Sequence, residues 1–245
     1  MKNVKLTIEY DGTNFSGWQR QPNARTVQEE IEKALTMLLK KEIKIYGSGR
    51  TDAGVHALGQ VANFKEEFTI PVERIPMALN SLLPGDISIK SAVEADHNFH
   101  ARFSATGKKY IYKILRSPMR RPLYRNYSYW ISEELDITAM RIAAAYFVGT
   151  YDFKGFMSSG SSVRDTIRTI YSFDVWFENN MIIIETSGNG FLYNMVRIMA
   201  GTLVDIGRNK IQRDDLPQII KEGIRDKGGH TAPAQGLYLA EVYYD

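Results

Sequence analysis

The feature that most constrains the fold is a strict alternation close to the N-terminus. Between residues 4 and 10, apolar side chains alternate with polar ones, which is the period of a β-strand with one buried face. Residues 27–41 then carry apolar side chains at helical spacing, and Thr26 with Glu29 predicts a capping box at the helix start. Because both elements have one apolar face to bury, they predict a layered fold of helices packed on a sheet.

The same two periods continue through the first half of the chain. They predict further strands at 43–46, 58–64 and 87–93 and a second helix at 72–83. The order strand, helix, strand, strand, helix, strand is typical of a ferredoxin-like, RRM-like unit with an antiparallel sheet.

The sequence of the second half predicts a similar set of strands and helices, with additional elements. Strands are expected at 110–115, 167–177, 181–186 and 237–243, and helices at 137–148, 191–206 and 214–223. Asn179 and Asn180 predict a hairpin turn, and the glycine-rich and serine-rich residues 154–165 predict a mobile loop. We therefore expect an α+β protein of two ferredoxin-like, RRM-like halves, residues 1–104 and 105–245. The halves would form a mixed, mainly antiparallel sheet flanked by helices, with an active-site cleft between them.

Composition narrows the classes of protein that this chain can belong to. A chain of 245 residues with 44% hydrophobic residues can bury a sizeable core. The absence of cysteine excludes disulfides, thiolate nucleophiles and cysteine-ligated zinc, and it fits a reducing cytoplasm. The chain has no long uncharged apolar run, so we expect no signal peptide and no membrane span. The net charge of +3 is too small to indicate a nucleic-acid partner by itself.

The distribution of charge is more informative than its sum. Residues 97–132 contain no Asp or Glu, yet they carry many cations, namely Arg102, Lys108, Lys109, Lys113, Arg116, Arg120, Arg121 and Arg125. Aromatic residues are interleaved with these cations, a mixture that favours RNA with unstacked bases as the partner. The alternative is that the alternating rings of 110–115 face the core while their lysines face water. We favour that alternative for most of the rings, but it does not explain why acidic residues are missing over so long a segment.

Residues 47–57, Gly-Ser-Gly-Arg-Thr-Asp-Ala-Gly-Val-His-Ala, connect two predicted strands and form a candidate site. Glycines allow unusual backbone conformations and remove bulk from around Asp52, so a ligand can approach one carboxylate flanked by Arg50 and His56. The alternative is an ordinary turn in which the aspartate caps its own backbone.

Arg197 is the second candidate, because it is the one charged residue within an otherwise apolar helical stretch. A buried guanidinium needs a partner, and a carboxylate that forms paired hydrogen bonds is the best one. Arg197 could instead extend to solvent or pair with Asp205. We expect it to pair with Asp52.

The string Gly-Arg-Thr-Asp-Ala-Gly-Val-His-Ala at residues 49–57 resembles the catalytic motif of the pseudouridine synthases of the tRNA-modifying TruA family. Other segments resemble the same family in the same order along the chain. They are Tyr-Asp-Gly-Thr at 10–13, Gly-Trp-Gln at 17–19, Thr-Val-Gln at 26–28, Phe-His-Ala-Arg-Phe-Ser-Ala at 99–105, Tyr-Ile-Tyr at 110–112, Phe-Leu-Tyr-Asn-Met-Val-Arg at 191–197 and Gly-Leu at 236–237.

The resemblance implies a cytoplasmic homodimer that isomerises uridine to pseudouridine at positions 38–40 of the tRNA anticodon stem-loop. It implies tRNA as the partner, no membrane, no cofactor and no metal. It also implies that Asp52 is the nucleophile, that Arg197 is its ion-pair partner and that Arg50 helps to displace the target base. Tyr110 would pack on the flipped uracil, and Leu237 would lie beneath the same base.

Two other classes of function remain open from the residues alone. A non-catalytic tRNA-binding protein would share the basic segment but would not need Asp52 and Arg197 together. A carboxylate-dependent hydrolase acting on nucleosides would need Asp52. The residues also do not distinguish attack of Asp52 on C1′ from attack on C6, or from removal of a sugar proton to give a glycal.

Overall fold

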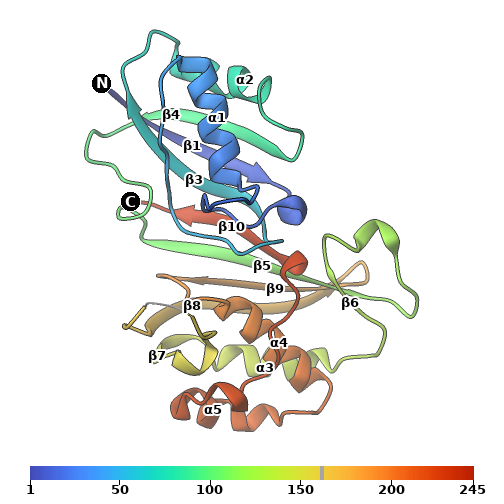
Figure 1. The fold of residues 1–245 in the computed structure, drawn as a ribbon. Coiled ribbons are helices and arrows are strands. Elements are labelled where there is room, and N and C mark those ends of the chain that lie inside the picture. The colour runs from blue at the N-terminus through green and yellow to red at the C-terminus, as the bar shows by residue number, and fades with distance from the viewer. Residues whose placement is uncertain (161–162) are drawn as a thin grey trace. The chain divides into compact units, whose positions relative to one another are not determined.

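The computed structural model describes residues 1–160 and 163–245 and divides the chain into two compact units (Figure 1). The first unit contains Met1–Thr106 and Tyr238–Asp245, and the second contains Gly107–Leu237. The strand pairs within each unit are antiparallel, apart from one parallel pair in each. The expected α+β class with a mixed, mainly antiparallel sheet is therefore confirmed.

The first unit follows the predicted order of elements. Its elements are β1 (Lys2–Tyr10), α1 (Val27–Leu39), β2 (Tyr46–Gly47), β3 (His56–Glu66), α2 (Ile75–Asn80) and β4 (Ile87–Ala95). The strands lie in the order β4-β1-β3, and β2 pairs with the other edge of β3. Figure 1 shows α1 and α2 on the same side of this sheet. The apolar residues of β1 are buried as the alternation predicts, and Val4, Leu6 and Ile8 are fully so.

The capping box predicted at the start of α1 does not form. The Thr26 hydroxyl is buried without a hydrogen-bond partner among the described residues, and the Glu29 carboxylate pairs with Lys33 at 3.3 Å. The first N–H groups of the helix donate instead to backbone carbonyls, Val27 N to Gly17 O at 3.3 Å and Gln28 N to Trp18 O at 3.0 Å. Because these carbonyls already satisfy the helix end, no side-chain cap is required.

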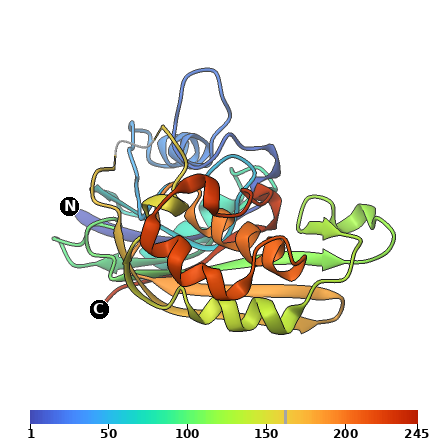
Figure 2. The same ribbon diagram turned by 90° about the horizontal axis from the view of Figure 1, so that it is seen from below.

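The second unit is built on β5 (Gly107–Arg116). Its other elements are β6 (Tyr129–Ile131), α3 (Ile137–Ala145), β7 (Gly149–Asp152), β8 (Ile167–Glu178), β9 (Met181–Gly188), α4 (Met195–Gly207) and α5 (Leu216–Glu222). The sheet order is β5-β9-β8-β7, and β6 pairs in parallel with β5. Figures 1 and 2 show the three helices grouped on one side of this sheet. The hairpin between β8 and β9 turns at Asn179 and Asn180, both with positive φ, as predicted.

Several predicted boundaries move in the structure. Helix α4 begins at Met195 rather than at residue 191, because Asn194 adopts a left-handed conformation with φ of 60°. Of the strand predicted at 43–46, only Tyr46 pairs. The expected mobile loop is ordered at its start, where Lys154–Phe156 form a 3-10 helix with Phe156 buried. Residues 161 and 162 of that loop lie outside the described residues.

The observed units differ from the expected halves, which meet between residues 104 and 105. The main difference is strand β10 (Leu237–Tyr243), which belongs to the first unit from Tyr238 onward. Tyr238 and Leu239 pair in parallel with β3, and the Thr106 N–H donates to the Tyr243 carbonyl at 3.0 Å. These backbone bonds hold the last residues in the first unit, although they follow the second half in sequence. Within the described residues, no helix is long and apolar enough to cross a membrane.

Candidate functional site

The loop that carries Asp52 is anchored to β3 at its beginning. The Ser48 N–H donates to the Val61 carbonyl at 2.7 Å, and the Ser48 hydroxyl donates to the Gln60 side chain at 2.6 Å. The Gln60 amide in turn donates to the Gly49 carbonyl at 3.1 Å. Ser48 and Gln60 are both buried, so these bonds are shielded from water and fix where the loop leaves the sheet.

The centre of the loop is held by the segment before α1. The Trp18 N–H donates to the Thr51 carbonyl at 3.1 Å, and the Thr51 hydroxyl bonds to the Tyr10 hydroxyl at 2.7 Å. Gly17, with φ of 95°, lies so close that a Cβ there would be 2.6 Å from the Thr51 oxygen. After Asp52, the Gly54 N–H donates to the Phe15 carbonyl at 3.3 Å, so the loop backbone is held on both sides of Asp52, which is itself half-buried. Burial raises the pKa of Tyr10 far above its usual range, so Tyr10 stays a neutral partner for Thr51.

His56 supports the loop and is not an open neighbour of the carboxylate. It is buried, its ring stacks on Tyr238 at 4.7 Å, and its Nδ1 accepts the Gly12 N–H at 3.0 Å. The Asp11 carboxylate lies 3.2 Å from the same nitrogen. The backbone N–H of Gly12 can only donate, so Nδ1 is the acceptor in that contact. Arg50, by contrast, is exposed.

Arg197 is held in a defined direction by groups of the second unit. Its Nε donates to the Ala232 carbonyl at 2.8 Å, and its Nη1 donates to the Asn194 side-chain oxygen at 2.7 Å. All the other residues of α4 are buried, as predicted for a helix that is apolar nearly all round. The carboxylate of Asp205, the alternative partner considered from the sequence, accepts hydrogen bonds from His230.

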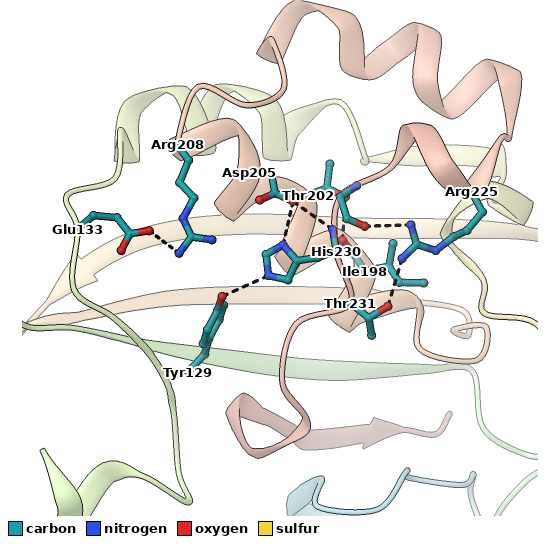
Figure 3. Close-up of polar contacts among 10 residues, drawn as sticks. Tyr129, Glu133, Ile198, Thr202, Asp205, Arg208, Arg225, His230 and Thr231 are labelled. Carbon is teal, nitrogen blue, oxygen red and sulfur yellow. Dashed lines mark hydrogen bonds and ion pairs between the residues drawn. The ribbon is translucent and has the colours of Figure 1, made fainter. Parts of the chain in front are cut away.

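The residues that lead to Leu237 lie along α4, and Figure 3 shows how they are attached. The Asp205 carboxylate accepts from the His230 N–H at 3.1 Å and lies 2.8 Å from the His230 Nδ1. The Gly229 N–H donates to the Thr202 hydroxyl at 2.9 Å, and Arg225 donates to the Gly229 carbonyl at 2.9 Å. The helix that carries Arg197 therefore also holds the segment that precedes Leu237.

Tyr112 links this segment to β5. Its hydroxyl donates to the Pro233 carbonyl at 2.7 Å, and a Cβ at Gly236 would lie 2.6 Å from its ring. Burial raises the pKa of Tyr112 well above its usual range, although the charge of Arg197 acts in the opposite direction. Tyr110 is on the same face of β5, two residues earlier, and its ring meets Phe191 edge-on at 5.1 Å. Sequence reasoning did not identify Tyr112, Asn194 or Asp205 with His230 as supporting residues.

The basic segment is partly occupied by contacts within its own unit. Lys109 pairs with Glu185 at 3.5 Å and Arg116 with Glu134 at 2.9 Å, whereas Arg120 lies over the Trp130 ring at 5.2 Å. Tyr110 and Tyr112 are buried, so the prediction that alternating rings of this strand face the core is confirmed. No group of three or more metal-binding side chains occurs within residues 1–160 and 163–245.

The predicted site residues fall into two groups. Asp52 and Arg50 belong to the first unit, and Tyr110, Arg197 and Leu237 belong to the second. Within the second unit, Tyr112 and the carbonyls of residues 232 and 233 connect Arg197 to the segment that ends at Leu237. The pairing of Asp52 with Arg197 stays a prediction.

The first unit thus carries a half-buried carboxylate on a glycine-bearing loop, and the second carries an oriented guanidinium on a buried helix. A family model described as tRNA pseudouridine synthase matches residues 6–104 and 143–245, and the chain belongs to this family.

Curated relatives match the whole chain. The proteins named tRNA pseudouridine synthase A of Caldicellulosiruptor bescii and Acetivibrio thermocellus are each 52% identical over 244 residues, covering 100% of both chains. The protein of the same name from Ruminiclostridium cellulolyticum is 52% identical over 245 residues, again with 100% of both covered. The resemblance to the TruA family is thereby confirmed, and with it the assignment to isomerases.

Likeness to solved structures is weaker. A chain of the crystal structure of a Cbf5-Nop10-Gar1 complex matches 94% of this chain and 56% of its own length, with a TM-score of 0.36 and 12% identity.

Proposed function

We propose that this protein isomerises uridine to pseudouridine at positions 38–40 of the tRNA anticodon stem-loop, with Asp52 as the nucleophile. The observation that carries the proposal is the construction of the Asp52 loop. Bonds of Ser48, Gln60 and Trp18 hold the backbone before Asp52, and the bond from the Gly54 N–H to the Phe15 carbonyl holds it after, so the residue that carries the carboxylate sits in a fixed backbone frame. Membership of the pseudouridine synthase family supports the same conclusion.

The reaction explains why such a frame is useful. The bond from N1 of uracil to C1′ breaks, the base rotates while it is held, and C5 forms the new bond to C1′. The C5 proton leaves and N1 gains a proton, so no electrons are lost or gained overall. A carboxylate can act as the covalent nucleophile or stabilise developing positive charge on the sugar, and both roles depend on exact placement.

The remaining residues have roles that fit a flipped base. A nucleotide inside a stem must leave the helix before an enzyme can act on it, which costs stacking energy. Arg50 is exposed on the Asp52 loop, which supports a role in displacing the base. Tyr110 and Leu237 are both buried apolar surfaces, which supports their packing on the two sides of uracil.

The test is release of tritium from tRNA that carries the label at C5 of uridine. An isomerase releases the label while the RNA chain stays intact and no free uracil forms. A tRNA-binding protein retains the label, and a nucleoside hydrolase would release labelled uracil. Asp52→Asn, which keeps the shape of the side chain but removes its charge, is the matched control and should release none. Label retained after long incubation with stoichiometric enzyme would rule out the proposal.

We also propose that Arg197 is the ion-pair partner of Asp52. The two bonds from Nε and Nη1 orient the guanidinium plane, which supports its use as a fixed, two-pronged cation. Losing one member of a buried pair typically costs about 3–5 kcal/mol, whereas losing both can be close to neutral.

A double-mutant cycle in urea tests this pairing. Arg197→Met with Asp52→Ala should be more stable than Arg197→Met alone, because no unpaired carboxylate is left. Asn194→Ala with Asp52→Ala is the matched control, since it removes a partner of Arg197 but no charge. Stability changes that add within about 0.5 kcal/mol for Arg197 and Asp52 would show that the residues do not meet.

The assembly and compartment are part of the same proposal. We propose a homodimer in the cytoplasm, which light scattering on the purified protein and localisation of a tagged chain would test.

A further inference from the structure

Three aromatic rings of the first unit meet at the surface, outside the Asp52 loop. The ring of His100 lies 5.1 Å from that of Tyr46 and 4.4 Å from that of Phe103. The two outer rings are open to solvent, Tyr46 at 52% and Phe103 at 77% exposed. A single exposed ring is ordinary, but three exposed or half-buried rings in one contact series, with neighbouring planes tilted by 43° and 38°, form a continuous aromatic surface.

The turn that carries His100 and Phe103 is held firmly, although its rings are exposed. The Ala101 N–H donates to the Asn63 side-chain oxygen at 2.9 Å, and the Asn63 amide donates to the Asn3 side chain at 2.9 Å. Asn3 donates in turn to the Phe99 carbonyl at 2.9 Å. Asn3 and Asn63 are both buried, so a polar network inside the unit fixes this surface turn.

Within the turn, hydrogen bonds also fix the imidazole itself. The Arg102 N–H donates to His100 Nδ1 at 3.1 Å, which fixes the direction in which that edge of the ring points. The His100 N–H donates to the Ser104 hydroxyl at 3.1 Å, and the Ser104 N–H donates back to the His100 carbonyl at 2.9 Å. The ring between Tyr46 and Phe103 therefore has one orientation.

The third ring belongs to the strand that opens the Asp52 loop. Tyr46 lies on β2 directly opposite Asn63 of β3, the same asparagine that holds the turn. Gly47 and Ser48 follow it and begin the loop. One short ladder thus positions both the exposed rings and the start of the candidate catalytic loop.

Charge around the rings indicates which flat ligand fits them. The guanidinium of Arg102 lies 5.6 Å from the Phe103 ring centroid and is exposed. No acidic residue occurs between positions 97 and 132, so the sequence on that side of the turn carries no negative charge. Flat rings with an adjacent cation are the arrangement that binds unpaired bases of a nucleic acid while pairing with its phosphates.

We propose that Tyr46, His100 and Phe103 form a stacking platform for an unpaired base of the RNA substrate, a different nucleotide from the uridine that is isomerised. Arg102 would contact a neighbouring phosphate. The platform would give affinity and register through stacking, which tolerates any base because every base has a flat face. This inference rests on RNA being the substrate, as in the proposed function.

The test measures binding and not catalysis, so its failure is distinguishable from failure of the proposed reaction. Affinity for an unmodified tRNA transcript is measured by fluorescence anisotropy at several salt concentrations, in an Asp52→Asn background that keeps the substrate unchanged. Phe103→Ala and Tyr46→Ala should each weaken binding by roughly fivefold to a hundredfold. The slope of log affinity against log salt should not change, because stacking releases no counterions.

Three further variants make the result specific. Phe103→Trp keeps a flat ring and should bind within about twofold of the parent. Arg102→Ala should lower the salt slope by about 0.7–0.9, the value for one phosphate contact. Met77→Ala is the matched control, because Met77 is 80% exposed in the same unit and has no ring. All variants should unfold at the same urea concentration as the parent.

Two results would overturn the proposal. The first is binding by Phe103→Ala and Tyr46→Ala that stays within twofold of Met77→Ala. The second is weaker binding that comes with a change of oligomeric state in light scattering, since the rings would then serve contact between copies of this chain.

Discussion

Gly17 offers the sharpest test of the way in which the Asp52 loop is held. Its φ of 95° is a conformation that residues with a side chain rarely adopt. A Cβ at this position would lie 2.6 Å from the Thr51 oxygen and 3.3 Å from the carbonyl carbon of Asp52. These are backbone atoms, so no side-chain rotation can relieve the contact. Gly17→Ala must therefore move either the segment before α1 or the loop that carries Asp52.

The expected magnitude has two parts. Placing a side chain at positive φ costs about 1–2 kcal/mol, and forcing an extra methyl into packed structure typically costs about 1–3 kcal/mol. The sum, about 2–5 kcal/mol, is a large share of the stability of an ordinary domain. A displacement of Asp52 by about 1 Å would in addition reduce the rate of label release about a hundredfold.

Variants at two other glycines separate the cost of a positive φ from the cost of the close contact. Gly160 has φ of 87°, but a Cβ at this position would have nothing within 4 Å of it among the described residues, so Gly160→Ala should show the conformational cost alone. Gly85 has neither a positive φ nor a neighbour within 4 Å, and Gly85→Ala should be neutral or slightly stabilising. Urea unfolding and tritium release are measured for all three. A Gly17→Ala protein as stable as Gly160→Ala and as active as the parent would refute the close approach.

Two further predictions concern the second unit. The raised pKa of Tyr112 means that the folded chain keeps this phenol protonated above pH 10 while the unfolded chain loses the proton, so stability falls as pH rises past 10. Tyr112→Phe should make that fall less steep in urea unfolding between pH 8 and pH 11, and an unchanged steepness would contradict the assignment. Asp205→Ala should destabilise by about 1–3 kcal/mol, because the His230 N–H loses its acceptor, and should slow label release with tRNA affinity kept within about twofold. Label release at the parent rate would show that this attachment does not position Leu237.

Sequence periodicity predicted the strands and helices well where one face is buried. The alternation in β1 and the apolar stripe of α1 are local consequences of having one face in the core. Helix α1 begins at the predicted residue, but the way its start is capped was not predictable, because its N–H groups bond to the carbonyls of residues 17 and 18. A carbonyl is the same in every residue, so such a cap leaves no trace in the sequence. Strand β10 could not be assigned to the first unit from chain order either, because it pairs with β3 through backbone groups, which also leave no trace in the sequence.

In the candidate site, too, residues marked by a local sequence pattern could be predicted, and residues defined by distant contacts could not. Asp52 and Arg197 could be proposed from local pattern, one from its glycine-rich surroundings and the other as a single charge in an apolar helix. Tyr112 could not, because its partner Pro233 is 121 residues away and looks like any other proline. His56 resembled an open neighbour of Asp52 until its buried contacts with Gly12 and Tyr238 were seen.

The hydrogen bonds of Arg197 and Tyr112 to the segment before Leu237 have side-chain donors and backbone acceptors. On one side stand particular side chains, Arg197 and Tyr112, which no other residue type can replace without losing a donor. On the other side stand the backbone carbonyls of Ala232 and Pro233, which depend only on the path of the chain. The path itself is fixed by Thr202 and Asp205 of the same helix. The position of Leu237 therefore depends on α4 and β5 and, among the residues that precede it, on the glycines at 229 and 236, where a Cβ would meet Thr202 and Tyr112.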